Sequence, residues 1–315
     1  MINWGIIGLG RMGLTFANAI KETSNSKLIS IASKTNKTFK DFKNETYDDL
    51  IINKNIEAIY ISTLNNTHVD LIERILNEGK KVLCEKPVST SLNDFMRIKK
   101  LISEKNIQFY EAIAYYAHPQ TLTLLNLIKN DEIGEIQSIE SNFGFKVKFN
   151  ASSRLFDKSL GGGVIFDLGC YPISFFMLLT EDLEKITIKS KNLNYTKSSV
   201  DDDAVAVLDY DKKFEGKIHV SFKKHLNNVC IIHGSKGFIK INEPWLPSKN
   251  STIEVSSNKH FYIKSINSKM SVYANQIERV SQSFIDQNNK FNLFNVEKSL
   301  TNMRLINNWL TNEII

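Results

Sequence analysis

Residues 5–13 read Gly-Ile-Ile-Gly-Leu-Gly-Arg-Met-Gly, directly before a helical pattern at Leu14–Lys21. This stretch contains the pattern G-x-G-x-x-G after a short apolar run, which indicates a dinucleotide site at a strand–helix turn. Gly8 permits the tight turn, Gly10 lets the backbone approach a pyrophosphate, and Gly13 allows close helix packing. The helix N-terminus then faces the phosphate charge. The alternative is a plain glycine-rich turn. We expect cofactor contacts from Gly8, Gly10, Arg11, Met12 and Gly13.

The first 120 residues alternate between strand-like and helix-like patterns. Short β-rich runs occur at Ile2–Ile7, Leu28–Ser33, Ile56–Ser62, Lys81–Cys84 and Ile107–Glu111. The segments between them carry apolar residues at helical spacing, as in Val69, Ile72 and Ile75. Strict strand–helix alternation predicts βαβ units and a doubly wound parallel sheet of the Rossmann type, an α/β domain over residues 1–120.

The pattern changes from about Ile133 onward. Successive β-rich runs follow at Gln137–Lys148, Lys185–Lys191, Asp203–Tyr210, Lys217–Phe222, Val229–His233 and Phe238–Ile241. Runs joined by turns such as Gly234–Gly237 predict an α+β domain with a largely antiparallel sheet, residues 121–315. Helical patterns at Ser271–Gln287 and Val296–Asn312 close the chain and can pack back on the first domain.

Composition places the chain among soluble globular proteins. Its 315 residues carry 40 basic and 34 acidic side chains, a net charge of +6 with no long run of one sign, so we expect no nucleic-acid or membrane surface. The apolar stretch Val164–Leu179 is broken by Asp167 and Pro172 and is not expected to span a bilayer. The cysteines are odd in number and far apart, which predicts neither a disulfide framework nor a zinc site: Cys84, Cys170 and Cys230. With no signal-like N-terminus, we expect a cytoplasmic protein.

The end of the second strand bears on the choice of cofactor. A site for NAD usually has an acidic residue there, whereas this chain reads Ser33-Lys34-Thr35-Asn36. Because hydroxyls and a cation suit a 2′-phosphate, Ser33 and Lys34 predict NADP, with NAD as the alternative. Lys34 as a merely exposed, solubilising lysine is the other interpretation.

Glu85-Lys86-Pro87 follows the strand Lys81–Cys84, at the edge where open α/β sheets bind ligands. Together with this motif, several others follow one another along the chain: Gly8–Gly13, Ser62–His68, Glu85–Pro87, Glu111–Gln120, Ser153–Asp157 with Gly161–Pro172, and Gly234–Gly237. With these motifs the chain resembles the Gfo/Idh/MocA oxidoreductase family. The chain departs from the family pattern at Leu64, where Pro is usual, and at Tyr116, where related members often carry Arg. The second departure bears on substrate class.

The resemblance implies a nicotinamide-dependent dehydrogenase acting on CH–OH groups, with a Rossmann domain and an open-faced second domain. It implies that Lys86 contacts the reacting oxygen, that Asp167 and Tyr171 complete the site, and that Lys86–Pro87 is a cis peptide. Tyr171 matches the branch that resembles glucose–fructose oxidoreductase, aldose dehydrogenases and dihydrodiol dehydrogenase. Further cofactor contacts are expected from Thr63, Asn65, His68, Glu85 and Lys86, and no metal is expected.

The proposed chemistry needs these residue types. Hydride transfer to or from a carbon that bears oxygen requires a partner for the proton on that oxygen. A tyrosine has a pKa near 10, so Tyr171 needs an adjacent cation, and Lys86 can supply it. Asp167 lies four residues before Tyr171, on the same face of a helix, and either pairs with Lys86 or binds a substrate hydroxyl. His118, before Pro119, is expected to be structural, and is the next candidate for the proton partner.

The leading functional prediction is an NADP-preferring oxidoreductase of sugar metabolism, acting on a sugar, a sugar derivative or a vicinal diol. One alternative is a hydrolase or lyase that retains its cofactor and uses transient oxidation. Another is a non-enzymatic NAD(P)-binding regulator, which the intact Lys86, Asp167 and Tyr171 set disfavours. We also expect a homodimer or homotetramer, because Val205 and Val207 predict an apolar outer face on the second sheet.

Overall fold

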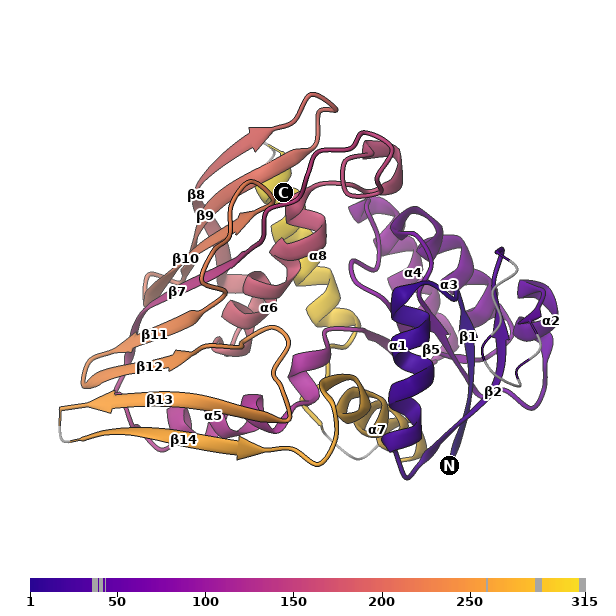
Figure 1. Ribbon diagram of the computed structural model, residues 1–315, viewed down its shortest axis with the longest axis horizontal. Coiled ribbons are helices and arrows are strands. Elements are labelled where there is room, and N and C mark those ends of the chain that lie inside the picture. Colours follow the sequence, from indigo (N-terminus) through magenta and orange to yellow (C-terminus); the bar gives the residue numbers. More distant parts are fainter. Residues whose placement is uncertain (36–38, 40–41, 43, 259, 287–290, 312–315) are drawn as a thin grey trace. The chain divides into compact units, whose positions relative to one another are not determined.

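The computed structural model describes residues 1–35, 39, 42, 44–258, 260–286 and 291–311 (Figure 1). The chain divides into two compact units, which are described separately. The first comprises Met1–Ala117 and Lys269–Ser299, and the second comprises His118–Ser268 and Leu300–Ile315. Three positions named above, Asn36, Gln287 and Asn312, lie outside the described residues.

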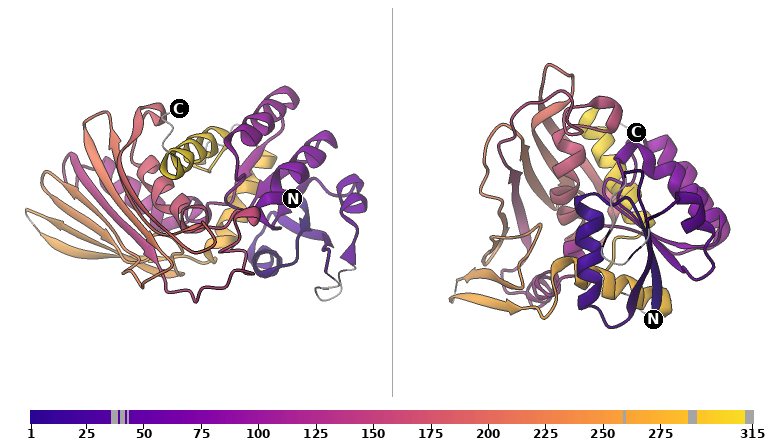
Figure 2. Two further views of the ribbon diagram at one scale, coloured as in Figure 1. Left: turned by 90° about the horizontal axis from the view of Figure 1, so that it is seen from above. Right: turned by 45° about the vertical axis from the view of Figure 1, so that its right-hand side comes forward.

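In the first unit, the described residues form a six-stranded sheet in the order β3-β2-β1-β4-β5-β6, with every strand pair parallel. The strands are β1 (Ile2–Ile7), β2 (Ser26–Ala32), β3 (Asn44–Glu45), β4 (Ala58–Ile61), β5 (Lys81–Cys84) and β6 (Phe109–Glu111). The helices are α1 (Arg11–Ala19), α2 (Tyr47–Ile52), α3 (His68–Asn77), α4 (Leu92–Lys105) and α7 (Val272–Ile285). In Figure 2, α1 and α7 lie on one face of this sheet and α3 and α4 on the other. This arrangement confirms the predicted doubly wound Rossmann sheet.

Aromatic packing fixes α1 and α7 against the first sheet. The Phe16 ring stacks on Tyr60 at 4.1 Å between centroids, and the Trp4 ring lies 5.6 Å from Phe284 of α7. The Trp4 indole donates to Ser281 Oγ at 2.9 Å. The predicted start of the first helix at Leu14 was wrong: α1 begins at Arg11, because Gly10 is already its N-cap.

The second unit is built on an eight-stranded sheet in the order β14-β13-β12-β11-β7-β10-β9-β8. Its described strands are β7 (Ile136–Gly144), β8 (Ile186–Tyr195), β9 (Asp201–Tyr210), β10 (Phe214–Ser221), β11 (Cys230–Gly234), β12 (Gly237–Ile241), β13 (Asn250–Ser257) and β14 (Phe261–Asn267). All pairs are antiparallel except β7 with β10. The largely antiparallel sheet is therefore confirmed, with the hairpin β13–β14 as an addition that the sequence did not predict.

Three helices accompany this sheet in Figure 1: α5 (Pro119–Lys129), α6 (Cys170–Leu178) and α8 (Val296–Leu310), the last spanning both units in sequence. A π-helical turn, Ile165–Gly169, leads directly into α6. The helical stretch Lys158–Leu178 is long and apolar enough to cross a membrane by length and composition, but 72% of its most apolar window is buried. Such burial is typical of a core helix.

Candidate functional site

The three glycines of the first turn have three different surroundings. Gly8 adopts φ +99°, and a Cβ on it would meet the Ser62 carbonyl oxygen at 2.7 Å. A Cβ on Gly13 would lie 2.1 Å from the Gly8 carbonyl oxygen, so α1 approaches the turn too closely for any side chain. A Cβ on Gly10 would meet no atom within 4 Å. The turn therefore leaves open space at Gly10, at the N-terminus of α1, where a pyrophosphate fits.

The glycine turn follows β1, and the neighbouring strand β2 ends in residues that carry hydroxyl groups and a positive charge. Asn44 fixes the backbone of Ser33, since its Oδ1 accepts from Ser33 N at 2.7 Å and its Nδ2 donates to Ser33 O at 3.0 Å. The Ser33 and Thr35 hydroxyls lie 3.0 Å apart. Lys34 is exposed, with its Nζ 5.8 Å from the centre of the Tyr47 ring. This group has the chemistry that a 2′-phosphate requires.

The segment after β4 lies beside the glycine turn. Ser62 Oγ donates to the Gly8 carbonyl at 2.7 Å, which ties the ends of β1 and β4 together. The Thr63 and Thr67 hydroxyls lie 2.7 Å apart around a short 3-10 turn that starts at Asn65. Thr63 and Asn65 are thus at the carboxyl edge of the sheet, as expected for cofactor contacts.

Lys86 lies between anchored neighbours. The Lys86–Pro87 peptide is cis, as the resemblance implied. Glu85 is 9% exposed and its Oε1 accepts from the Tyr60 hydroxyl, while the Pro87 carbonyl oxygen lies 2.9 Å from His68 Nδ1. Lys86 itself is half-buried. The sheet core therefore holds the backbone on both sides of the lysine.

Burial shifts the pKa values of His68 and Glu85, the side chains whose contacts hold the segment around Lys86. It lowers the pKa of His68 to about 4, an effect that the Lys86 charge reinforces, so the ring is neutral near pH 7. Burial also raises the pKa of the Glu85 carboxyl, opposed by the Tyr60 hydrogen bond and by the charges of Lys86 and Arg11. Since Arg11 acts on Glu85, the glycine turn and the lysine segment share one electrostatic environment.

Glu111, at the end of β6, was not predicted from the sequence to have a role in the site. Its side chain is 1% exposed, and its Oε1 accepts from Val88 N at 3.2 Å. Burial raises its pKa to about 7, opposed by the Ser299 hydroxyl, the Val88 N–H and Lys86. The rule that polar residues at carboxyl strand ends line ligand sites would have found it.

Tyr116, where related members often carry Arg, lies inside the first unit. It is 1% exposed, and its ring meets the Phe294 ring edge-on at 5.1 Å. Lys298 Nζ lies 5.2 Å from the ring centre, and burial lowers the pKa of this lysine to about 8. A cation is therefore present beside Tyr116, supplied by α8.

In the second unit, a glycine run shapes the segment that carries Asp167. A Cβ on Gly162 would meet the Arg154 carbonyl oxygen at 2.9 Å, and Gly163 adopts φ +119°. Asp201 caps the following helical turn: its Oδ2 accepts from Ile165 N at 2.7 Å. Burial raises the pKa of Asp201 to about 6. The run thus folds residues 154–157 back against the start of the helix.

This fold places Arg154 against Asp167. Arg154 Nη1 and Nη2 both lie 3.3 Å from Asp167 Oδ1, an ion pair that the sequence analysis missed. Asp167 lies in the π-helical turn and Tyr171 follows four positions later in α6, so the helix that carries both is not a regular α-helix. That the two side chains share one face stays a prediction. The Tyr171 ring packs edge-on against Phe143 at 5.4 Å and lies 6.4 Å from Trp245. Asp167 and Tyr171 therefore lie on one helical segment. The Asp167 carboxylate is paired with Arg154, and the Tyr171 ring packs against other aromatic rings.

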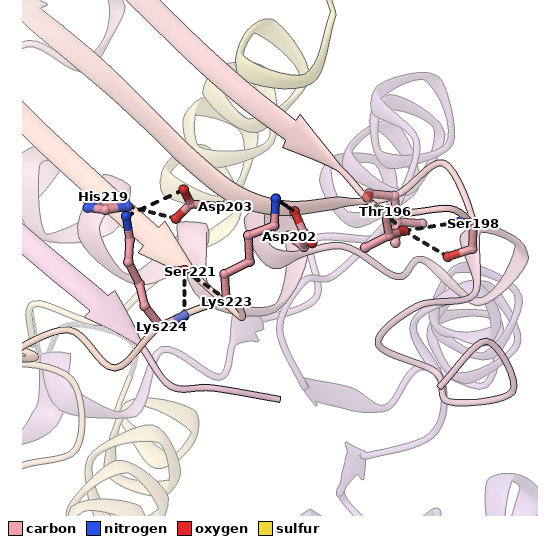
Figure 3. Close-up of polar contacts among 9 residues, drawn as sticks. Thr196, Ser198, Asp202, Asp203, His219, Ser221, Lys223 and Lys224 are labelled. Carbon is pink, nitrogen blue, oxygen red and sulfur yellow. Dashed lines mark hydrogen bonds and ion pairs between the residues drawn. The ribbon is translucent and has the colours of Figure 1, made fainter. Parts of the chain in front are cut away.

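The acids that follow Asp201 are paired with cations (Figure 3). Asp203 lies 2.8 Å from His219 Nε2 and 3.7 Å from Lys224 Nζ, and Asp202 lies 3.1 Å from Lys223 Nζ. Burial tends to raise the pKa of Asp203, but hydrogen bonds from His219 and Ser221 outweigh it and lower the value. The described residues contain no cluster of three or more His, Cys, Asp or Glu side chains arranged to hold a metal.

His118 has a structural role. It is fully buried, and its Nδ1 accepts from Gln120 N at 3.2 Å as the N-cap of α5. Within the first unit, the structure thus brings together the glycine turn, Ser33 with Lys34, the segment after β4, and Lys86. Asp167 and Tyr171 belong to the second unit.

Comparison with known proteins identifies the family. The family model described as "Oxidoreductase family, NAD-binding Rossmann fold" matches residues 2–113, and the model described as "GFO/IDH/MocA C-terminal domain" matches residues 121–240. The chain belongs to the Gfo/Idh/MocA family of oxidoreductases. It is an oxidoreductase with an NAD-binding domain, which confirms the class of protein and the class of cofactor predicted from its motifs.

Characterised relatives cover most of the chain. Trans-1,2-dihydrobenzene-1,2-diol dehydrogenase of Xenopus tropicalis is 25% identical over 256 residues, 78% of this chain and 77% of its own. D-xylose 1-dehydrogenase (NADP(+)) 2 of Haloferax volcanii is 26% identical over 227 residues, 70% of this chain and 69% of its own.

Solved structures show the same fold at lower identity. A 3-ketoreductase from Actinomadura kijaniata, in complex with NADP and TDP-benzene, superposes with TM-score 0.86 at 21% identity, covering 97% of this chain and 96% of its own. Aldose-aldose oxidoreductase from Caulobacter crescentus gives TM-score 0.88 at 16% identity, covering 98% and 96%. Both likenesses concern the fold alone.

Proposed function

We propose that this oxidoreductase is an NADP-preferring dehydrogenase that acts on the CH–OH group of a sugar, a sugar derivative or a vicinal diol. One observation carries the proposal: the open space at Gly10 and the anchored Lys86 lie along the same carboxyl edge of one parallel sheet. The relatives named for diol and xylose dehydrogenation support the substrate class.

The glycine turn, Thr63 and Asn65 would hold a dinucleotide, and Ser33 with Lys34 would hold its 2′-phosphate. Bound there, the nicotinamide supplies or accepts the hydride. In the proposed reaction, Lys86 would polarise the substrate oxygen, and Tyr171 would take or give the proton. Asp167, which is ion-paired with Arg154, would orient a substrate hydroxyl or the lysine. The second unit would then form the substrate-binding and oligomerisation domain, without Lys269–Ser299, which belong to the first unit although the sequence predicted one domain over residues 121–315.

The outer face of the second sheet supports a homodimer or homotetramer. Along β9, Ala204, Ala206 and Leu208 are buried, whereas Val205 and Val207 on the opposite face are half-exposed. A second copy would remove these apolar side chains from water. Three free, buried cysteines support a reducing, cytoplasmic setting.

A substrate screen tests the proposal. Aldoses, inositols, vicinal diols and nucleotide sugars are offered with NADP⁺ or NAD⁺, and reduced nicotinamide is followed by absorbance. We expect oxidation of at least one polyhydroxylated compound, faster with NADP⁺. Tight NADP(H) binding with no oxidation of any compound would instead favour a nucleotide-binding regulator.

A further inference from the structure

We propose that Glu111 is a positioning residue for Lys86, acting through its hydrogen bond to Val88 N–H. Nothing in the family match or in the names of the relatives assigns Glu111 a role. The inference rests on the proposed function only for its effect on turnover. The geometry itself concerns the first unit alone.

Lys86 is held by contacts on both sides. On the amino side, Glu85 N donates to the Ile61 carbonyl at 2.9 Å, which continues the pairing of β5 with β4. On the carboxyl side the strand has ended, so Val88 N cannot use a neighbouring strand. Its partner is Glu111 Oε1 at 3.2 Å. Glu111 therefore completes the backbone pairing where the sheet no longer can.

Glu111 is well placed for this task. The register pairs it with Cys84, the last residue of β5, and Ala112 N donates to the Cys84 carbonyl at 2.8 Å. Glu111 N donates to the Phe294 carbonyl at 3.0 Å. With its backbone fixed on two sides and its side chain 1% exposed, the carboxyl has little freedom to leave Val88.

The electrostatic surroundings agree with a role in hydrogen bonding. The charged groups that act on Glu111 are Lys86 and Glu85, with the Ser299 hydroxyl beside it and the Cys84 thiol as the other titratable neighbour. Burial raises the pKa of Glu111 to about 7, so a large fraction of it is neutral near neutral pH. A neutral carboxyl still offers a carbonyl oxygen to Val88, so the hydrogen bond does not depend on the charge.

Two conservative variants separate the hydrogen bond from the charge. Glu111→Gln keeps an acceptor oxygen at the same reach and removes the charge. Glu111→Asp keeps the charge and withdraws the oxygen by one methylene. Glu104→Asp, at an exposed glutamate of α4, is the matched control. Each variant is measured for kcat, KM, NADPH dissociation constant, thermal unfolding and hydrogen exchange at the Val88 amide.

We expect Glu111→Asp to lose about tenfold to a hundredfold in kcat, because a misplaced reacting group is costly, with NADPH affinity within about threefold of wild type. Glu111→Gln should keep kcat within about threefold, and Val88 exchange should be about tenfold faster in Glu111→Asp only. Wild-type kcat in Glu111→Asp, or equal loss in both variants, would overturn the proposal.

The outcomes for Glu111 and for the proposed function are distinguishable. If the wild type oxidises no compound, the proposed function fails, and hydrogen exchange at the Val88 amide alone tests the role of Glu111. Equal exchange rates at this amide in wild type and Glu111→Asp would then overturn the Glu111 assignment. If Glu111→Asp does not fold, Glu111→Gln decides, since a kcat about tenfold or more below wild type would show that the charge is required.

Discussion

Alanine at Gly13 should lower stability, whereas alanine at Gly10 should mainly weaken NADPH binding, although the two glycines lie in one turn. A Cβ at position 13 would lie 2.1 Å from the Gly8 carbonyl oxygen and 3.1 Å from Ser62 Oγ, so backbone must move. Overpacking of this kind costs about 1–3 kcal/mol, partly offset by the better helix propensity of alanine. We expect a net loss of about 2 kcal/mol, or a Tm lower by about 4–8 °C.

At Gly10, φ is −78° and a Cβ meets no atom within 4 Å, so alanine fits the free protein. Loss of a glycine N-cap should cost no more than about 1 kcal/mol. The new methyl group occupies the space assigned to the pyrophosphate, so the gain in Tm on adding NADPH should largely vanish. At a concentration of 100 times the wild-type Kd, that gain corresponds to about 2.7 kcal/mol.

Thermal unfolding of both variants, with and without NADPH, checks this pair. A Gly10→Ala protein that keeps the full NADPH-dependent gain in Tm would refute the placement of the pyrophosphate. A Gly13→Ala protein as stable as the wild type would refute the assignment of Gly13 to helix packing.

Three further predictions concern other parts of the molecule. Lys34→Ala should weaken NADP(H) binding about tenfold to a hundredfold and leave NAD(H) nearly unchanged; equal weakening in a fluorescence titration contradicts the 2′-phosphate assignment. Since the pKa of Glu111 is raised from 4.5 to about 7, its carboxyl destabilises the fold as pH rises through that range. Glu111→Gln should therefore gain about 3 kcal/mol relative to wild type between pH 4.5 and pH 7 in urea titrations, and a pH-independent difference would contradict this. Sedimentation should show a dimer or tetramer, whereas a particle of only 36.0 kDa at micromolar concentration would exclude the proposed assembly.

Sequence patterns predicted those parts of the fold that depend on residues close together in the chain. The glycine turn and the alternation of apolar runs predicted the Rossmann sheet, because strand, turn and helix signals lie within a few residues of each other. The hairpin β13–β14 was missed although Ile253 and Val255 in β13 and the run Phe261–Ile263 in β14 favour strands, because Ser and Asn residues shorten both apolar runs.

The missed site residues depend on long-range structure. Glu111 reaches Val88 only because β5 and β6 pair in a register that no single segment encodes. Arg154 reaches Asp167 only after the glycine run folds the chain back. The π-helical turn at Ile165–Gly169 interrupts the regular α-helix before Tyr171, and α-helical periodicity in the sequence does not predict such a turn.

Turnover of Tyr171→Phe on the best substrate of the screen tests the account most directly. This substitution keeps the ring that packs against Phe143 and removes only the hydroxyl. We expect unchanged folding and NADPH binding, with kcat lower by about 10²–10⁴, as for loss of a general acid–base. Lys86→Ala should cost at least as much, and the double variant much less than the product of the two losses, because the proposed reaction uses both residues in one step. Near wild-type turnover by Tyr171→Phe would contradict the account.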